Sequence, residues 1–285
     1  MLVQHKRESL LDWLAIPLPG KRIVNEAVKY APVRQVASNG GNVITVYQSR
    51  KMQREIRTES RHLEFPAGLT HEHNLDVLEF YPQPCRLKFE MIDGQGEIHQ
   101  IDHTPDFLLI TEKDLILEEW KSQSKLEGLA RKYPWRYQLD PEGNWCSPCI
   151  ELWLAERGVS YRIRTDTMIS RRRIENTLFL EDYLHPSAEA CPVDVETRIQ
   201  DAIAEQPVLY LTELYEQANC QPDDAFKLIA DGLLVADMDG ASLSEPSRCR
   251  VFRDRAVRDF ERARRPLPPA QPIAGILDIR VGMRL

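Results

Sequence analysis

Two short apolar runs separated by a polar break form the clearest hydrophobic pattern in the chain. Phe107–Ile110 and Leu115–Leu117 are apolar, and Thr111–Asp114 between them is mostly polar. Apolar runs of strand length on either side of a short polar break predict a β-hairpin. We therefore expect these two runs to form neighbouring antiparallel strands.

Charged residues stand at the open end of this predicted hairpin. Asp106 opens the first strand, and Glu119 and Lys121 close the second. Side chains two residues apart on a strand point to the same face, so Glu119 and Lys121 project together. The hairpin brings Asp106 back beside them. The pattern thus predicts two carboxylates and one ammonium group at one end of an otherwise apolar sheet.

The patterns around the hairpin predict a mixed α/β fold. A helix is expected to begin near Ser60, a plausible N-cap, and Asp93–Gly96 is a strong turn signal between two strands. After the hairpin the chain predicts helices over 125–133 and 150–157 and a strand over 159–164. A hairpin followed by helix and strand gives a mixed sheet with helices on its faces.

A second pattern begins after a predicted domain boundary at 185–187. Helices are expected over 195–205, 211–218 and 223–234, followed by short strands that end at Val251 and Phe252. Three helices and a wing resemble a winged helix-turn-helix. We therefore expect a first domain over 1–185, a winged-helix-like domain over 186–258 and a Pro-rich tail over 259–285.

Length and composition are those of a globular protein. The chain has 285 residues, 42% hydrophobic and 28% charged. It shows no apolar run of membrane-spanning length and no signal-peptide pattern, so we expect a cytoplasmic protein. The six cysteines are scattered and are expected to be reduced. Cys146 and Cys149 form the only close pair, and no second pair or histidine follows at zinc-ligand spacing.

The distribution of charge is more informative than the net charge of −7. Residues 1–60 carry ten lysines and arginines against five acids, whereas residues 186–247 carry two against thirteen. From Arg248 to Arg265 eight arginines face three acids. The third helix of the winged-helix pattern would ordinarily read DNA, but here it begins Asp223-Asp224. Its acidity favours a protein-binding module.

The residues at the end of the hairpin suit metal-dependent phosphodiester chemistry. Carboxylate oxygens bind Mg²⁺, and bound Mg²⁺ activates water and stabilises charge on a phosphoryl group. A lysine beside them can position the attacking water or stabilise the phosphate. The order Pro105-Asp106, then Glu119-x-Lys121, resembles the signature of restriction-endonuclease-like nucleases. The alternative is an ordinary hairpin with charged ends.

Five motifs extend this resemblance over roughly residues 33–165. They are Ser49–Met52, Glu59–Glu64, Asp76–Pro84, Pro105–Phe107 and Glu119–Lys121. Their order and spacing resemble those of the TnsA-type endonuclease subunit of heteromeric, Tn seven-like transposases. The resemblance implies a restriction-endonuclease-like PD-(D/E)xK fold, with a mixed sheet flanked by helices.

The resemblance also implies a set of site residues. Glu64 corresponds to a helix carboxylate, Asp106 and Glu119 to a metal-binding pair, and Lys121 to a catalytic lysine. Glu64 and the backbone carbonyl of Trp120 would complete the ligands of Mg²⁺, for which Mn²⁺ would substitute. The position of Glu119 is a glutamine in some members of the family, so the acid here favours an intact metal site.

Basic residues near these motifs are candidates for binding double-stranded DNA. Arg50, Lys51 and Arg54 follow a predicted strand, and Lys132 lies near the end of a predicted helix. Lysine and arginine side chains contact phosphates without reading sequence. The alternative is a set of solvated charges on loops and helix faces.

The resemblance implies a function in cut-and-paste DNA transposition. The chain would cut the 5′, non-transferred strand at transposon ends, while a DDE-type transposase subunit acts on the 3′ ends. An AAA+ ATPase regulator is the second expected partner, through the C-terminal domain. Two alternatives stay open: a non-cleaving scaffold that bridges transposase and regulator, and a restriction-type nuclease.

Overall fold

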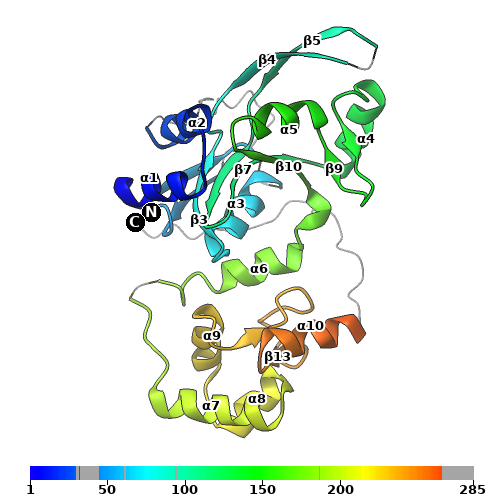
Figure 1. Ribbon diagram of the computed structural model, residues 1–285. Coiled ribbons are helices and arrows are strands. Elements are labelled where there is room, and N and C mark those ends of the chain that lie inside the picture. The colour runs from blue at the N-terminus through cyan, green and yellow to red at the C-terminus, as the bar shows by residue number, and fades with distance from the viewer. Residues whose placement is uncertain (30–31, 33–44, 61, 94, 186, 265–285) are drawn as a thin grey trace. The chain divides into compact units, whose positions relative to one another are not determined.

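The computed structural model describes residues 1–29, 32, 45–60, 62–93, 95–185 and 187–264 (Figure 1). Within these residues the chain divides into two compact units, one from Met1 to Met168 and one that starts at Ile169. Each unit buries its own set of apolar side chains.

A four-stranded mixed sheet forms the centre of the first unit. Its strands are β3 (Val77–Pro82), β6 (Phe107–Thr111), β7 (Leu115–Lys121) and β10 (Ser160–Thr165). They lie in the order β10-β7-β6-β3, with β6 antiparallel to both neighbours and β10 parallel to β7. The predicted hairpin is the central pair β6–β7. Every residue of these two strands except the last of each is buried, as a central position between helices requires.

Helices flank this sheet. Helix α3 (Glu64–His73) packs beside β3, and α5 (Pro148–Ala155) packs beside β10. Three further helices belong to the unit: α1 (Gln4–Trp13), α2 (Leu18–Lys29) and α4 (Gln123–Lys132). The mixed α/β class predicted from the sequence is therefore confirmed. Among the described residues, no helix combines the length and the apolar character needed to cross a membrane.

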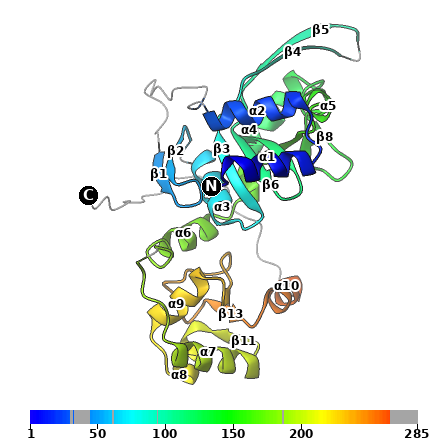
Figure 2. The same ribbon diagram turned by 60° about the vertical axis from the view of Figure 1, so that its left-hand side comes forward.

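Three hairpins surround the central sheet. They pair β1 (Thr45–Ser49) with β2 (Arg54–Thr58), β4 (Leu87–Ile92) with β5 (Ile98–His103), and β8 (Gln138–Leu139) with β9 (Trp145–Cys146). The β4–β5 ribbon extends beyond the helices of its unit in both views (Figures 1 and 2). Its far end is therefore exposed, while its near end delivers His103 to the core.

A buried ion pair attaches the N-terminal helix to the sheet. Arg7 on α1 donates from Nε to Glu79 Oε2 on β3 at 2.7 Å, and both side chains are almost fully buried. The backbone N–H of Leu2 and the hydroxyl of Tyr81 also donate to the Glu79 carboxylate. Three donors thus offset the cost of burying this charge. The N-terminal segment packs on the core of its own unit.

The second unit is a small helical domain with a short sheet. Its helices are α6 (Arg171–Phe179), α7 (Val193–Glu205), α8 (Leu211–Ala218), α9 (Pro222–Ala230) and α10 (Arg255–Arg264). Its strands are β11 (Val208–Tyr210), β12 (Val235–Ala236) and β13 (Arg250–Phe252), in the order β11-β13-β12. Apolar residues of α7, α8 and α9 pack with β13 around Ile199, Leu214, Leu228 and Val251.

The second unit begins earlier than the predicted boundary at 185–187. Asn176 on α6 donates from Nδ2 to the carbonyls of Met238 and Ala241, and its Oδ1 accepts from Leu243 N–H. Leu180 and Tyr183 join the apolar cluster of the same unit. These contacts span more than sixty residues of sequence, so a local composition change could not reveal them. Residues 259–264, predicted as tail, continue α10, and residues 265–285 lie outside the described chain.

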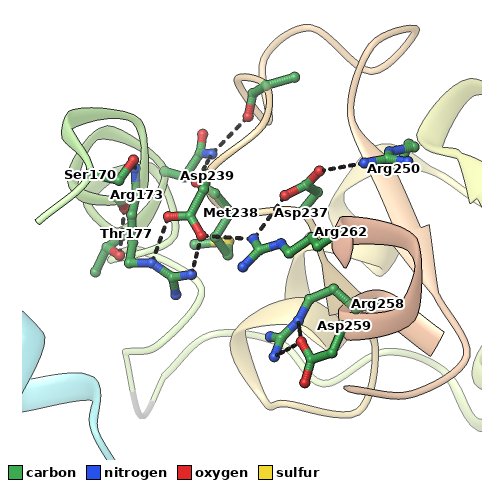
Figure 3. A network of polar contacts seen from close by, with 12 residues as sticks. Ser170, Arg173, Thr177, Asp237, Met238, Asp239, Arg250, Arg258, Asp259 and Arg262 are labelled. Carbon is green, nitrogen blue, oxygen red and sulfur yellow. Dashed lines mark hydrogen bonds and ion pairs between the residues drawn. The ribbon is translucent and has the colours of Figure 1, made fainter. Parts of the chain in front are cut away.

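A network of charges joins three segments of the second unit (Figure 3). Arg262 on α10 donates to Asp237 Oδ1 at 2.9 Å and to Asp239 Oδ2 at 2.7 Å. Arg173 on α6 pairs with Asp239, and Arg250 on β13 pairs with Asp237. The two aspartates lie just after β12 and are largely buried. Each therefore has two arginine partners that compensate for its desolvation.

The network predicts a pH-dependent contribution of Asp239 to stability. Desolvation alone would raise the pKa of Asp239, but Arg173 and Arg262 lower it below its usual value. A depressed folded-state pKa stabilises the fold above the unfolded pKa of about 3.9, and the stabilisation disappears as pH falls below it. Asp239→Asn should therefore lower the free energy of unfolding by about 2 kcal/mol at pH 7. The difference from wild type should shrink between pH 4 and pH 2 in urea titrations.

Asp194→Asn is the matched control for this experiment. Asp194 also pairs with an arginine, Arg198, but its side chain is 75% exposed. Solvent screens such pairs, so this change should leave unfolding nearly unaffected. Equal effects of the two substitutions at pH 7 would contradict a stabilising role for the buried network.

Candidate active site

The β6–β7 hairpin places Asp106 beside the last residues of β7. Phe107 pairs with Glu118, and the Asp106 N–H donates to the Glu118 carbonyl at 2.8 Å. The Asp106 side chain turns along β7, where its Oδ2 accepts from the Trp120 N–H at 2.6 Å. As expected from the apolar pattern, the hairpin brings Asp106 beside the charged residues that end β7.

Burial raises the pKa of Asp106 to about 6, opposed by the charge of Lys121 and the Trp120 N–H. A carboxylate at the end of a buried apolar sheet loses water that it would bind in solution. The charge of Lys121 and the hydrogen bond from the Trp120 N–H replace only part of this lost hydration. The Asp106 carboxylate is consequently a desolvated acceptor with capacity for a further cation or proton.

Glu64 approaches the same position from α3. It occupies the first turn of the helix, and its Oε2 accepts from the Glu59 N–H at 2.8 Å. Burial and then the negative charge of Asp106 raise the pKa of Glu64 to about 8, although Lys121 acts in the opposite direction. The effect of Asp106 on Glu64 shows that the two carboxyl groups lie close enough to interact, while the ligand role that the resemblance implies for Glu64 stays a prediction.

Lys121 is the cation of this group. Burial lowers the pKa of its ammonium group to about 8, while the carboxylates of Asp106 and Glu64 act to raise it. The charges of Lys125 and Arg136 lower it further. Desolvation thus leaves Lys121 close to its ionisation midpoint near neutral pH.

Glu119 lies on the same face of β7 as Lys121 and is 2% exposed. Its Oε1 pairs with the Lys121 ammonium, and its Oε2 lies 2.9 Å from His103 Nε2. The second contact is a close approach without hydrogen-bond alignment. Tyr161 on β10 places its hydroxyl 2.9 Å from the same His103 nitrogen. Glu119 is therefore held by the protein itself.

Sequence patterns gave no indication of His103 and Tyr161. They are 58 residues apart, on β5 and β10, and both are buried. The available signal was that His103 ends a strand three residues before Asp106. The sequence around Tyr161 does not indicate that this residue lies near the hairpin. Its strand, β10, reaches β7 by pairing with it in the sheet, and that pairing joins segments distant in sequence.

The opposite face of β7 carries a different carboxylate. Desolvation would raise the pKa of Glu118, but His71, Arg164 and the Trp120 indole bring it down to about 2. The Trp120 Nε1 donates to Glu118 Oε2 at 3.0 Å, so Trp120 is engaged through both its indole and its backbone N–H. Glu118 is thus a satisfied structural carboxylate. The predicted role of the Trp120 carbonyl as a ligand stays a prediction.

The predicted DNA-binding residues lie in different surroundings. Lys51 donates from Nζ to the carbonyls of His71 and Asn74, both at 2.6 Å, at the C-terminal end of α3. These bonds favour a structural role for Lys51 as a helix cap. Arg54 lies over the Tyr81 ring, and Arg50 belongs to the turn after β1. Lys132 is exposed at the end of α4, where its ammonium lies 5.0 Å from the Tyr133 ring centre.

The donor set fits a hard divalent cation. Glu64, Asp106 and Glu119 offer carboxylate oxygens, the ligands that Mg²⁺ prefers. Burial raises the pKa values of Glu64 and Asp106, and a bound cation would favour their ionised forms. Their ligand atoms do not all lie within 4.8 Å of one another, since Glu119 pairs with Lys121 and His103. Within the described chain such a close group occurs instead at Asp93, Glu97 and His99, on the tip of the β4–β5 ribbon.

Comparison with known proteins does not identify a family for this chain. No protein-family model matches this chain, and a search of curated proteins gives no match either. The interpretation of the site therefore depends on the grouping of Glu64, Asp106, Glu119 and Lys121 and on the contacts described above.

Proposed function

We propose that this chain is a metal-dependent DNA endonuclease. One observation carries the proposal: three carboxylates and a lysine, all desolvated, interact at one end of a buried mixed sheet. Perturbed ionisation of several groups in one place is typical of catalytic sites.

The arrangement of elements supports a restriction-endonuclease-like fold for the first unit. The central hairpin supplies Asp106, Glu119 and Lys121, and a flanking helix supplies Glu64. Combined with the resemblance in motif order, this supports a TnsA-type nuclease subunit of a heteromeric transposase. We propose that it cuts the 5′ strand at transposon ends.

In this proposal Glu64, Asp106, Glu119 and the Trp120 carbonyl would hold Mg²⁺, with Mn²⁺ as a substitute. When bound, the ion would supply an activated water and charge stabilisation for phosphodiester hydrolysis. Lys121 acts on the attacking water or on the phosphate. Burial lowers the pKa of Lys121, so its ammonium group loses a proton more readily than that of a solvent-exposed lysine. Its amine can take a proton from the attacking water, or its ammonium form can stabilise the phosphate.

A specific contact favours the alternative of a non-cleaving scaffold. Lys121 pairs with Glu119 Oε1, and His103 Nε2 lies 2.9 Å from Oε2 without hydrogen-bond alignment, so the carboxylate would have to release Lys121 to bind a metal through both oxygens. A scaffold would retain this arrangement in the presence of metal. The two functions therefore differ in whether Mg²⁺ or Mn²⁺ binds and whether DNA is cut.

The second unit supports a protein-binding role. Asp223 on α9 accepts from the Tyr183 hydroxyl, and Lys227 bonds the Tyr183 carbonyl and Asp231. The rings of Phe179 and Tyr183 pack on Phe226 at 5.0 and 5.6 Å. The segment before α7 therefore covers part of the helix that a winged-helix protein would place in a DNA groove. A groove on α7 and α8, which includes Asp201 and Glu205, is a more accessible surface.

The metal assignment predicts loss of cleavage in ligand variants. Asp106→Ala or Glu119→Ala should lower Mg²⁺-dependent nicking of element-end DNA by roughly 100-fold or more, because changes even around a metal ligand cost 10- to 100-fold. Mn²⁺ binding by calorimetry should weaken in parallel. Glu127→Ala, an exposed acid on α4, is the control and should behave as wild type. Wild-type nicking by either site variant would refute the assignment.

The lysine assignment predicts different results for two substitutions at one position. Lys121→Ala should abolish cleavage while Mn²⁺ binding is largely retained. Lys121→Arg keeps the charge but has a head group that does not deprotonate in proteins. If Lys121 accepts a proton, Lys121→Arg should recover little activity in single-turnover assays. Full recovery would show that the positive charge alone is required.

The proposal for the second unit predicts partner binding without DNA binding by α9. The fragment 169–264 includes α6 and its contacts, and it should bind the transposase subunit or the ATPase regulator of its own system in pull-down assays. Because α7 and α8 present acids, binding should weaken with salt and with Asp201→Asn plus Glu205→Gln. Duplex binding that is lost on Lys227→Ala would contradict this role, whereas weak binding through the α10 arginines would not.

A further inference from the structure

Helix α4 begins directly after the candidate catalytic lysine. Ser122 caps it by accepting from the Lys125 N–H, so the helix direction is fixed by the end of β7. Lys125, Gly128 and Lys132 are spaced by three and four residues and share one edge of the helix. Both lysines are exposed. At 3.6 residues per turn, the acid Glu127 and the exposed Arg131 lie roughly 90° or more around the helix from the centre of this edge, and Arg131 is three residues from Gly128.

Gly128 has no structural explanation within the described protein. A Cβ added at this position would meet no described atom within 4 Å, so packing does not require glycine here. The backbone does not require it either, because the residue is helical without a positive φ. Glycine in a helix interior lowers stability relative to alanine. Its advantage on an open helix face is that another molecule can approach the backbone closely.

The lysine edge of α4 lies close enough to the candidate site to act on it. Lys125 lies in the first turn of α4, four residues after Lys121 at the end of β7. Lys132 lies seven residues further along, or about 10 Å at 1.5 Å per residue. That distance corresponds to roughly three nucleotide steps of 3.4 Å in one DNA strand. The two ammonium groups are therefore spaced to contact phosphates about three nucleotides apart along the duplex axis.

The region after α4 continues the positive charge. Residues 121–136 contain five lysines and arginines and a single acid, in a chain of net charge −7. Arg136 packs against the Tyr137 ring at 5.3 Å, and its Nε donates no hydrogen bond to a described residue. Positive charge concentrated beside an acidic site is the arrangement needed to hold a polyanion whose reacting phosphate enters that site.

We propose that the Lys125–Gly128–Lys132 edge of α4 binds the phosphodiester backbone of the DNA strand that leaves the active site. Gly128 allows the strand to lie against the helix between the two ammonium groups. This inference rests on the proposed function in taking DNA as the substrate, and it assigns the binding surface. The contacts are to phosphates, so the surface holds DNA without reading its sequence.

The test is a binding titration with the full-length chain. A fluorescently labelled duplex of arbitrary sequence is titrated by anisotropy in EDTA, at several salt concentrations. Lys125→Ala and Lys132→Ala should each weaken binding by about threefold to tenfold and lower the salt slope by about one. Arg131→Ala removes the same charge from a position roughly 90° around the helix from the centre of this edge, and it should change affinity by less than about twofold.

The Gly128→Ala variant distinguishes a helix face that contacts DNA from one that does not. Alanine should raise the melting temperature by about 1–3 °C through its helix propensity. The same variant should weaken DNA binding by about threefold or more, because its methyl group displaces the strand. Higher stability with unchanged affinity would overturn the inference. So would equal losses from Arg131→Ala and Lys125→Ala.

The proposed function and this inference fail in different ways. If wild type binds DNA along α4 but does not cut it with Mg²⁺, the surface assignment holds and the nuclease assignment fails. If wild type cuts DNA and the α4 variants bind as well as Arg131→Ala, the surface assignment fails alone. A wild-type chain with no affinity for DNA would overturn both.

Discussion

The main constraint on the first unit is that charged side chains at the ends of its central strands are buried away from water. The two central strands are buried on both faces, so the polar groups at their ends must satisfy one another. At one end Asp106, Glu64 and Lys121 shift each other's pKa values, and Glu119 pairs with Lys121. The compensation is incomplete for Glu64 and Asp106. That imbalance is the physical basis for proposing a cation-dependent active site there.

The two faces of β7 carry two buried carboxylates with different partners. Glu118 accepts from Arg164 and Trp120 and lies 3.1 Å from His71 Nε2, and its pKa falls to about 2 despite desolvation. One residue further along, Glu119 faces Lys121 and a histidine that is also in contact with Tyr161. Both glutamates are equally buried, at 2% exposure. Burial alone therefore does not identify a site, and the number and kind of partners do.

The two units solve the same electrostatic problem in different ways. In the second unit, Asp237 and Asp239 are paired with three arginines from α6, β13 and α10 (Figure 3), which leaves charge balanced and holds distant segments together. In the first unit Glu79 and Glu118 are likewise compensated, whereas burial leaves Glu64 and Asp106 with raised pKa values. Raised pKa values in neighbouring carboxyl groups mark these two residues as candidates for a functional site.

The sequence by itself determined the hairpin, because the period of a strand and a short polar break are local properties. The same local pattern was enough to place Asp106, Glu119 and Lys121 together. The mixed α/β class also followed from the succession of patterns. The tertiary structure alone decided that His103 lies against both Glu119 and Tyr161, that Lys51 caps α3, and that α6 belongs to the second unit. These contacts depend on pairings between segments that are distant in sequence. Such pairings determine which side chains are buried and which charges lie near them, and they produce no periodic pattern in the sequence.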